Sequence, residues 1–495
     1  MYNGKSGLFV TRQPAPAPNK ETVKIRMINP TSKKAFWLNI VVFATALTGF
    51  GQSSGPNAGN PSSKPLLQPI QVHKESPVTA VTPYVKPTPY VKKTSIVTPS
   101  SATALTPAEM VVPGYTGILV ETLDGKTVSE STSMGTFNPA SNVKVATAFA
   151  VLKAFGPEFR FATDVWTDGT LDKNSGTLYG NVYVSGRDPI FNPEHAIALA
   201  YELNRLGVSS ISGDLVVTDN FSLGFSTSAA RSGQSLNSIM DASKRSPAAT
   251  RAWLTYLSNS GRFNQVQGVP SVSITGGSYV QAIPSNLRLL FRHESAPMRE
   301  ILKVTLCYSN NFLAERLGDM LGGAYAVARS VHLNAGVPQE QFYLQTSSGL
   351  GVNRVTPQAM MRLLRALRSE LSRYKMTFAD IMPVAGVDKG TLANRFDEGF
   401  DTGSVVGKTG TLGNTDGGVS SLCGEISTRN GRLLFVIFNQ RGGVNGFRSF
   451  QNNFVSTVQA SFGGAAPMNY NPVSLDVRLA KTRVSYPTTR MGMND

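Results

Sequence analysis

Residues 138–152 read NPASNVKVATAFAVL, and this stretch decides the fold. Pro139 suits the first turn of a helix, because the N–H group that proline lacks has no partner there. Over residues 143–152 the side chains are apolar on nearly every face. A helix of that kind is buried in the middle of a domain. The stretch therefore predicts a core helix with Ser141 in its first turn and Lys144 three residues later.

The segments on either side of this helix predict a sheet covered by helices. A strand is expected before it at 118–121, and residues 160–285 change to short strands broken by Gly, Asp and Asn. The later elements are expected as helices at 298–303, 311–321 and 357–371, strands at 405–409, 419–426 and 433–439, and a helix at 447–462. The last two strands flank Asn430-Gly431, a strong hairpin signal. The fold class is therefore α/β, more narrowly α+β, with an antiparallel sheet flanked by helices.

The N-terminal region, residues 1–51, has the pattern of a secretion signal. Its apolar run at 35–47 follows a pair of lysines and ends at small residues. The run is short for a membrane-spanning helix, which needs about 20 residues. We expect a cleaved signal with the start of translation at Met27, and the alternative is an uncleaved membrane anchor through residues 35–50. Either way the protein is expected to be exported to the periplasm or the cell envelope.

Two further segments have compositions that cannot bury a core. Residues 52–106 are rich in Pro, Ser, Thr and Val, which predicts a disordered linker. Residues 463–495 are polar, which predicts a disordered tail. The main globular domain is then expected at 107–159 plus 286–462, and the strand-rich domain at 160–285 is inserted into it.

The charge of the chain is strongly basic, with a formal net charge of +16. The basic residues are scattered and form no compact cluster with interleaved aromatic residues, which argues against nucleic-acid binding. A protein that works among the anionic polymers of a cell wall would also carry such a charge.

Histidine and cysteine are too sparse for a metal site or a Ser-His-Asp triad. The four histidines lie far apart in the sequence, and the two cysteines, Cys307 and Cys423, match no metal-binding spacing. Two interpretations of the cysteines stay open. They are either two small buried thiols or one disulfide formed in oxidising surroundings.

Three short motifs occur in order along the chain, namely Ser141-Asn142-Val143-Lys144, Ser309-Asn310-Asn311 and Lys408-Thr409-Gly410-Thr411. Together they resemble the motif set of penicillin-binding proteins and serine β-lactamases. Ser-x-x-Lys alone is weak evidence, because a second copy at 372–375 lies in a charged stretch that we interpret as a solvated helix face. The three motifs together, with the serine opening an apolar helix, are specific.

The first motif supplies a nucleophile and a base. Ser141 is a weak nucleophile unless a base takes its proton. Lys144 lies one turn further along the same helical face and can act as that base when its amine is neutral. Lowering the pKa of a lysine from about 10.4 to about 7 takes roughly 4–5 kcal/mol. Burial and a neighbouring cation, Lys408, are expected to supply it.

The second motif and the first residue of the third are expected to serve proton transfer and binding. Ser309 would relay a proton between Lys144 and the leaving group. Asn311 would hold Lys144 and an amide of the substrate. Lys408, on a strand, would present its charge to a carboxylate of the substrate.

The rest of the third motif is expected to line the substrate. Gly410 would let the substrate backbone approach the strand closely, and Thr409 and Thr411 would offer hydroxyl groups. The backbone N–H groups of Ser141 and Thr411 would form an oxyanion hole, in which one donor is worth about 2.7–4 kcal/mol.

Over about residues 114–462 the chain resembles the class C, type 4 penicillin-binding proteins, the D-alanyl-D-alanine carboxypeptidases/endopeptidases of peptidase family S13. The strings that carry the resemblance are NPASNVK at 138–144, GNVYVSGRDP at 180–189, YSNNFLAE at 308–315, SGL at 348–350, NRVTP at 353–357, PVAGVD at 383–388 and KTGT at 408–411. Two departures stand out. The insertion looks short for the family, and Gly351 stands where members commonly have serine.

The resemblance implies a transpeptidase/β-lactamase-like domain with an insertion between the first two motifs. It also implies hydrolysis of peptidoglycan stem peptides that end in D-Ala-D-Ala, or of their D-alanyl cross-links, through an acyl-enzyme on Ser141. β-Lactam antibiotics would be inhibitors, and no metal or organic cofactor is implied. Two alternatives stay open, namely a serine β-lactamase and a catalytically inactive cell-wall binding protein.

Overall fold

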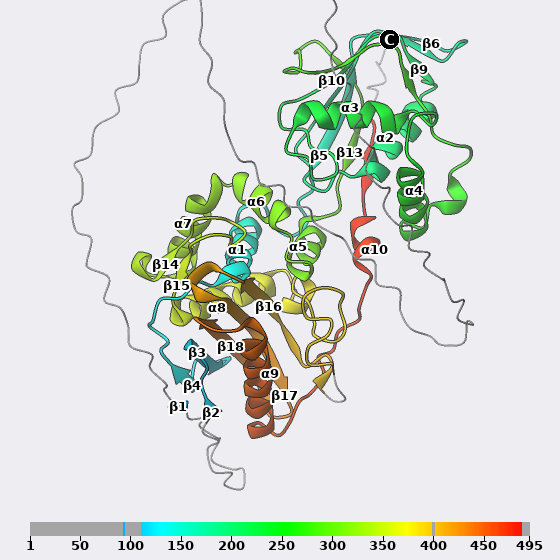
Figure 1. Ribbon diagram of the computed structural model, residues 1–495. Coiled ribbons are helices and arrows are strands. Elements are labelled where there is room, and N and C mark those ends of the chain that lie inside the picture. Colours follow the sequence, from blue (N-terminus) through cyan, green and yellow to red (C-terminus); the bar gives the residue numbers. More distant parts are fainter. Residues whose placement is uncertain (1–92, 95–109, 398–400, 488–495) are drawn as a thin grey trace, which may run out of the picture. The chain divides into compact units, whose positions relative to one another are not determined.

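The computed structural model describes residues 93–94, 110–397 and 401–487 (Figure 1). The predicted signal or anchor at 1–51 and most of the predicted linker at 52–106 lie outside these residues. The exception is β1 (Lys93–Thr94), which pairs antiparallel with β2 (Met110–Val111). Among the helices of the described residues, none combines the length and the apolar character needed to cross a membrane.

A five-stranded antiparallel sheet carries the Lys-Thr-Gly motif on its edge strand. Its spatial order is β16 (Val405–Leu412), β17 (Val419–Thr428), β18 (Gly431–Gln440), β3 (Tyr115–Thr122) and β4 (Thr127–Ser131). The hairpin predicted at Asn430-Gly431 is confirmed, because β17 and β18 pair along their whole length on either side of this turn.

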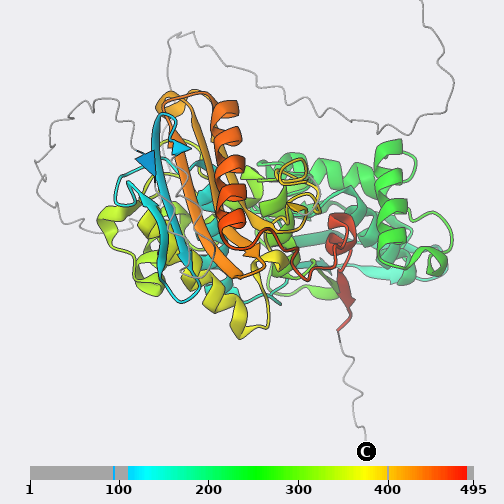
Figure 2. The same cartoon turned by 90° about the horizontal axis from the view of Figure 1, so that it is seen from below.

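The two faces of this sheet pack against different helices. On β18, Val436 and Phe438 pack with α1 (Val143–Phe155) and α8 (Pro357–Arg373). Phe435 and Ile437 pack instead with α9 (Val444–Ser461), which Figure 2 shows lying along the sheet. Because successive side chains of a strand point to opposite faces, a strand covered on both sides is apolar throughout. The predicted sheet flanked by helices is therefore confirmed.

The predicted core helix is confirmed as well. Every residue from 143 to 152 is buried, and one 3₁₀ turn, η1 (Ala140–Asn142), precedes α1. The other helices of this domain are α5 (Met298–Cys307), α6 (Asn311–Asp319) and α7 (Gly323–Ala335), with short 3₁₀ turns η3 (Gln339–Gln341), η4 (Phe378–Asp380) and η6 (Thr415–Gly417). Sequence patterns did not predict α7 or the short pair β14 (Phe342–Tyr343) and β15 (Arg354–Val355).

The inserted domain lies between the first two motifs, as predicted, and it contains helices as well as strands. One sheet has the order β12 (Ser278–Val280), β10 (Leu215–Val217), β8 (Val182–Gly186), β5 (Ala162–Thr167), β13 (Arg288–Glu294) and β19 (Arg483–Ser485). The other has the order β11 (Ser273–Ile274), β9 (Ser210–Ile211), β7 (Thr177–Tyr179) and β6 (Thr170–Asp172). The helical elements are α2 (Pro193–Arg205), α3 (Ala229–Met240), α4 (Pro247–Asn259) and η2 (Phe263–Gln265). The predicted boundary at 285 is too early, because β13 pairs with β5 inside the insertion.

The prediction of a disordered tail from residue 463 is wrong for residues 463–487, which we name the C-terminal strap. The strap contains α10 (Leu475–Leu479, red in Figure 1), and its last strand, β19, pairs antiparallel with β13. Its polar composition suggested disorder, but its polar groups have partners in the rest of the protein. Residues 488–495 lie outside the described part of the chain.

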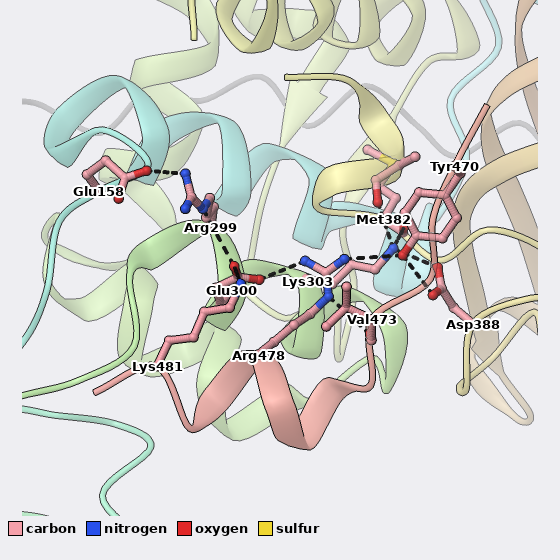
Figure 3. A network of polar contacts seen from close by, with 11 residues as sticks. Glu158, Arg299, Glu300, Lys303, Met382, Asp388, Tyr470, Val473, Arg478 and Lys481 are labelled. Carbon is pink, nitrogen blue, oxygen red and sulfur yellow. Dashed lines mark hydrogen bonds and ion pairs between the residues drawn. The ribbon is translucent and has the colours of Figure 1, made fainter. Parts of the chain in front are cut away.

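A buried network of charges ties the strap to α5 (Figure 3). The carboxylate of Glu300 accepts hydrogen bonds from Arg478 at 2.7 Å and from Lys481 at 2.6 Å. On the same helix, Lys303 Nζ donates to Asp388 Oδ2 at 2.7 Å, and Tyr470 of the strap donates to the other oxygen of Asp388 at 2.9 Å. Buried charges are tolerated when they are paired and hydrogen-bonded in this way.

Arg478→Ala is expected to destabilise the protein by about 3 kcal/mol, because removing one partner of a buried ion pair leaves the other charge under-compensated. Arg478 and Glu300 have side-chain exposures of only 9% and 2%. Denaturant unfolding checks the change in the free energy of unfolding. The matched control is Arg373→Ala, whose pair with Glu370 has an exposed arginine. This control is expected to cost less than about 1 kcal/mol, and equal losses would contradict the assignment.

Candidate active site

Ser141 lies in the 3₁₀ turn η1, two residues before α1 begins rather than within it. The turn is held in a strained conformation, since Ala140 has a φ of +46°. Such backbone strain costs about 1–3 kcal/mol and concentrates at active sites. Hydrogen bonds fix the turn, because Asn138 Oδ1 accepts from the N–H of Ala140 at 3.1 Å and Ser421 Oγ donates to the carbonyl oxygen of Pro139 at 2.6 Å.

Two glycines allow other segments to reach this turn. A Cβ atom at Gly410 would overlap Ser421 Oγ and lie 2.6 Å from the carbonyl oxygen of Pro139. A Cβ atom at Gly349, where φ is +89°, would overlap the carbonyl oxygen of Ala140. In this structure Gly410 makes room for the turn that carries Ser141. That Gly410 also lets the substrate backbone approach the strand closely stays a prediction.

Lys144 connects the first two motifs. Its Nζ atom lies 3.0 Å from Ser141 Oγ and donates to Asn311 Oδ1 at 2.7 Å and to the carbonyl oxygen of Ser348 at 2.6 Å. The side chain is 1% exposed. Burial lowers the pKa of Lys144 to about 7, against a smaller raising effect of Glu315. The geometry thus brings a serine hydroxyl within hydrogen-bond distance of an amine that is substantially neutral near pH 7.

Lys408 is placed differently from the expectation. Its side chain is fully buried, and Nζ donates to the carbonyl oxygen of Thr409 at 2.7 Å. The ammonium group therefore lies beneath the surface of the site and does not present its charge to a substrate there. Burial, followed by repulsion from Lys144, lowers the pKa of Lys408 well below its usual value. The lowering at Lys144 comes from burial and needs no contribution from Lys408.

The second motif forms the connection between α5 and α6. Ser309 has a φ of +54°, another strained position. Asn310 caps α6, since its Oδ1 accepts from the N–H of Leu313 at 3.0 Å. Asn311 then begins the helix and reaches Lys144. Ser309 lines a pocket of about 770 Å³ together with Ser141, Thr409 and Thr411. The structure thus brings all three motifs to one place.

The family model of the D-Ala-D-Ala carboxypeptidase 3 (S13) family matches residues 109–229 and 239–456. The chain belongs to the S13 peptidase family. It is therefore a serine peptidase, and the match spans both the domain with the three motifs and most of the insertion.

Two curated relatives of this S13 peptidase are similar over most of their length. The D-alanyl-D-alanine carboxypeptidase of Actinomadura sp. (strain R39) is 24% identical over 421 residues, covering 65% of this chain and 77% of that protein. Carboxypeptidase Rv3627c of Mycobacterium tuberculosis is 24% identical over 379 residues, covering 70% and 80%.

Two kinds of solved structure have a similar fold. The Bd3459 predatory endopeptidase of Bdellovibrio bacteriovorus has a TM-score of 0.63 at 24% identity, covering 72% of this chain and 96% of its own. Penicillin-binding protein 4 (dacB) of Haemophilus influenzae, solved with a β-lactam, has a TM-score of 0.52 at 20% identity, covering 70% and 96%. At these identities the likeness establishes the fold.

Sequence reasoning missed a supporting carboxylate, Glu315. Its two oxygens accept from the N–H groups of Ser347 at 3.1 Å and Ser348 at 2.9 Å. This holds the segment whose carbonyl oxygen, at Ser348, accepts from Lys144. A signal was present, because Glu315 stands four residues after Asn311 and shares its face of α6.

The site of this S13 peptidase also contains an arginine that belongs to none of the three motifs. Arg448, on α9, lines the pocket, and its Nη2 donates to Thr411 Oγ1 at 3.1 Å.

Cys307 and Cys423 are both buried and free, so the disulfide interpretation is wrong. Burial raises the pKa of each thiol to about 12. Within the described residues, no group of three His, Cys, Asp or Glu side chains could hold a metal ion.

Proposed function

We propose that this S13 peptidase hydrolyses the bond that follows D-alanine in peptidoglycan stem peptides, through an acyl-enzyme on Ser141. The observation that carries the proposal is the Lys144 amine, 3.0 Å from Ser141 Oγ, with a pKa lowered to about 7. The D-Ala-D-Ala carboxypeptidase family match supports the substrate. Both the terminal D-alanine and a D-alanyl cross-link offer such a bond.

Acylation starts with proton transfer from Ser141 Oγ to the neutral amine of Lys144. The Oγ atom attacks the carbonyl carbon of D-alanine, and a tetrahedral oxyanion forms. The C–N bond then breaks, and the leaving amine takes the proton from Lys144, with Ser309 as the relay. An ester between Ser141 and the D-alanyl carbonyl remains.

Deacylation reverses the proton transfers. A water molecule gives a proton to Lys144 and attacks the ester carbonyl. When the C–O bond to Ser141 breaks, Oγ takes the proton back, and the peptide leaves with a new terminal carboxylate. The enzyme returns to its starting state.

The oxyanion would be stabilised by the backbone N–H groups of Ser141 and Thr411. Each donor of this kind typically stabilises the transition state by about 2.7–4 kcal/mol. Thr411 lies on β16, the edge strand of the sheet, next to the turn that carries Ser141. Preorganisation favours this role, because the strained turn and the strand are fixed before substrate arrives.

Labelling with a fluorescent penicillin, with mass spectrometry to locate the adduct, tests the proposal together with release of D-alanine from an acyl-D-alanyl-D-alanine peptide. A long-lived adduct on Ser141 and release of D-alanine would support the peptidase. Rapid loss of penicillin without a lasting adduct would indicate a β-lactamase instead. A folded protein that does neither would indicate a catalytically inactive binding protein.

The substrate also implies that the protein works in the cell envelope, and we propose that residues 35–50 direct its export. Mass spectrometry of the N-terminus of the protein isolated from its own cells distinguishes a cleaved signal from a retained anchor. An intact N-terminus on protein found only in the cytoplasm would contradict export.

Glu315→Gln is expected to shift the acid limb of the kcat/KM profile to lower pH. The negative charge of Glu315 raises the pKa of Lys144, so its removal lowers that pKa further. The amine then stays neutral, and able to act as a base, at lower pH. A pH profile of kcat/KM measures the shift. Glu340→Gln removes an equal charge from an exposed position and is expected to leave the limb in place. A shift of the Glu315→Gln limb to higher pH would contradict the prediction.

A further inference from the structure

One wall of the active-site pocket is a loop at residues 383–394, which we name the wall loop. The members of this loop that line the pocket are Gly390, Thr391 and Asn394. The N–H group of Thr391 donates to the carbonyl oxygen of Cys307 at 2.9 Å, and a Cβ atom at Gly390 would overlap that oxygen. Cys307 is the last residue of α5, two residues before Ser309. The wall loop therefore supports the backbone that leads into the second motif.

A buried ion pair anchors the wall loop to α5. Lys303 Nζ, on the helix, donates to Asp388 Oδ2, in the loop, at 2.7 Å. The other two protons of this ammonium group go to the carbonyl oxygens of Ala379 and Met382, at 2.7 and 2.6 Å. Asp388 Oδ2 also accepts from the N–H group of Val384 at 2.8 Å, which closes the loop on itself. Burial lowers the pKa of Lys303, so the charge of this ammonium group depends on the acceptors around it.

The strap contacts both members of this ion pair through one tyrosine (Figure 3). The hydroxyl group of Tyr470 donates to Asp388 Oδ1 at 2.9 Å. The centroid of its ring lies 4.8 Å from Lys303 Nζ, where the face of an aromatic ring attracts a cation. Arg478 Nη2 donates in turn to the same hydroxyl at 3.3 Å, which orients the tyrosine toward the carboxylate. Tyr470 is therefore built into the anchor of the wall loop.

The same strap belongs to the inserted sheet. Its last strand, β19, pairs antiparallel with β13, and Val484 lies opposite His293. One segment of about 25 residues thus contributes a strand to the insertion and a tyrosine to the support of the active-site wall. A displacement of that strand would reach the wall loop through Tyr470 and Asp388.

Resting on the proposed function, we propose that Tyr470 is a positioning residue, which fixes the wall loop through Asp388 and so holds Ser309 in place for proton transfer. Ser309 has a φ of +54°, a strained conformation that persists only where the surrounding structure maintains it. A proton relay needs its groups at hydrogen-bond distance, and a displacement of about 1 Å slows a reaction by a large factor. The strap therefore makes the rate of the reaction depend on a segment that contributes no residue to the three motifs.

Tyr470→Phe tests this role, because it keeps the ring beside Lys303 and removes the hydroxyl group that binds Asp388. We expect acylation by a fluorescent penicillin at each reactive site, and kcat for release of D-alanine, to fall by about 10-fold. This is the effect of losing one hydrogen bond to a charged group. The final amount of label counts the reactive sites, and the time course gives the rate at each site. A purely structural role would lower the count and leave the rate unchanged.

The pH profile separates this effect from one on the base. Burial lowers the pKa of Lys144 to about 7, and Tyr470→Phe leaves that burial in place. The acid limb of kcat/KM is therefore expected to stay near pH 7 while the plateau falls. A limb displaced in Tyr470→Phe would place the effect on Lys144 and overturn the role assigned through Ser309.

Tyr486→Phe is the matched control. Tyr486 belongs to the same strap, and its hydroxyl group also donates to a carboxylate, that of Glu202 on α2 in the insertion. This variant is expected to keep the wild-type rate at each site. A wild-type rate per site in Tyr470→Phe, or equal slowing in both variants, would overturn the inference while the proposed function stands. A folded wild type that takes up no penicillin and releases no D-alanine would overturn the proposed function, and the inference with it.

Discussion

Ser141→Ala is expected to abolish the penicillin adduct and to reduce release of D-alanine by about 10⁴-fold or more, as loss of a nucleophile does in other serine hydrolases. The hydroxyl is the atom that forms the acyl-enzyme, and among the described hydroxyls of the pocket it is the one hydrogen-bonded to Lys144 Nζ. Adduct formation by mass spectrometry and D-alanine release in steady state both measure the effect.

The second Ser-x-x-Lys copy supplies a matched control for this variant. Ser372 is exposed on α8 and does not line the pocket that holds the three motifs. Ser372→Ala is expected to keep full activity and the adduct on Ser141. Near-normal turnover in a folded Ser141→Ala protein would exclude the acyl-enzyme proposed here.

Lys144→Met is expected to slow acylation by about 10²–10⁴-fold, the usual contribution of a general base. It also removes a specific pH dependence. In the wild type, kcat/KM is expected to rise as the pH rises through about 7, because the neutral amine is the active form and burial lowers the pKa of Lys144 to about 7. Below that pH the ammonium cannot accept the proton of Ser141. The pH profile of kcat/KM measures this limb.

Lys375→Met, in the second Ser-x-x-Lys copy, is the control, because Lys375 is exposed. The limb near pH 7 is expected to persist in this control and to disappear in Lys144→Met. If a folded Lys144→Met protein kept the same limb, the titrating group would be another residue, and Lys144 would not be the base.

Sequence patterns correctly predicted those elements whose formation depends on residues close together in the chain. The helix at 143–155 follows from Pro139 and the long apolar run after it, and the hairpin at Asn430-Gly431 follows from turn chemistry. The defined structure of the C-terminal strap does not follow from such patterns. It depends on partners far away in sequence, such as Glu300 for Arg478, and a polar segment with distant partners has the same composition as a disordered one. The predicted boundary of the insertion was too early for the same reason, because the true boundary depends on the pairing of β13 with β5, which is distant in sequence.

The motifs located the site, but they did not determine which way each side chain faces. Ser141, Lys144 and Asn311 come together as expected. Lys408 is buried. Its burial depends on how β16 packs, and the sequence of the four-residue motif alone does not determine it. Arg448 was missed because it lies on a mostly polar helix, where an arginine that faces a pocket looks like one that faces water.

The antiparallel pairing of β3 with β18 also governs when the protein becomes active during its synthesis. The end of β3 and the start of β18 are separated by roughly 300 residues of chain, a long-range pairing of the kind that slows folding. At ribosomal rates of about 5–20 residues per second, roughly 15–60 s pass between the two. Ser141 and Lys144 are made early, but the strand that completes their pocket comes from the last quarter of the described chain. A nascent or prematurely terminated chain that lacks β16 therefore carries the nucleophile and its base without a working site, so cutting is delayed until this strand has been made.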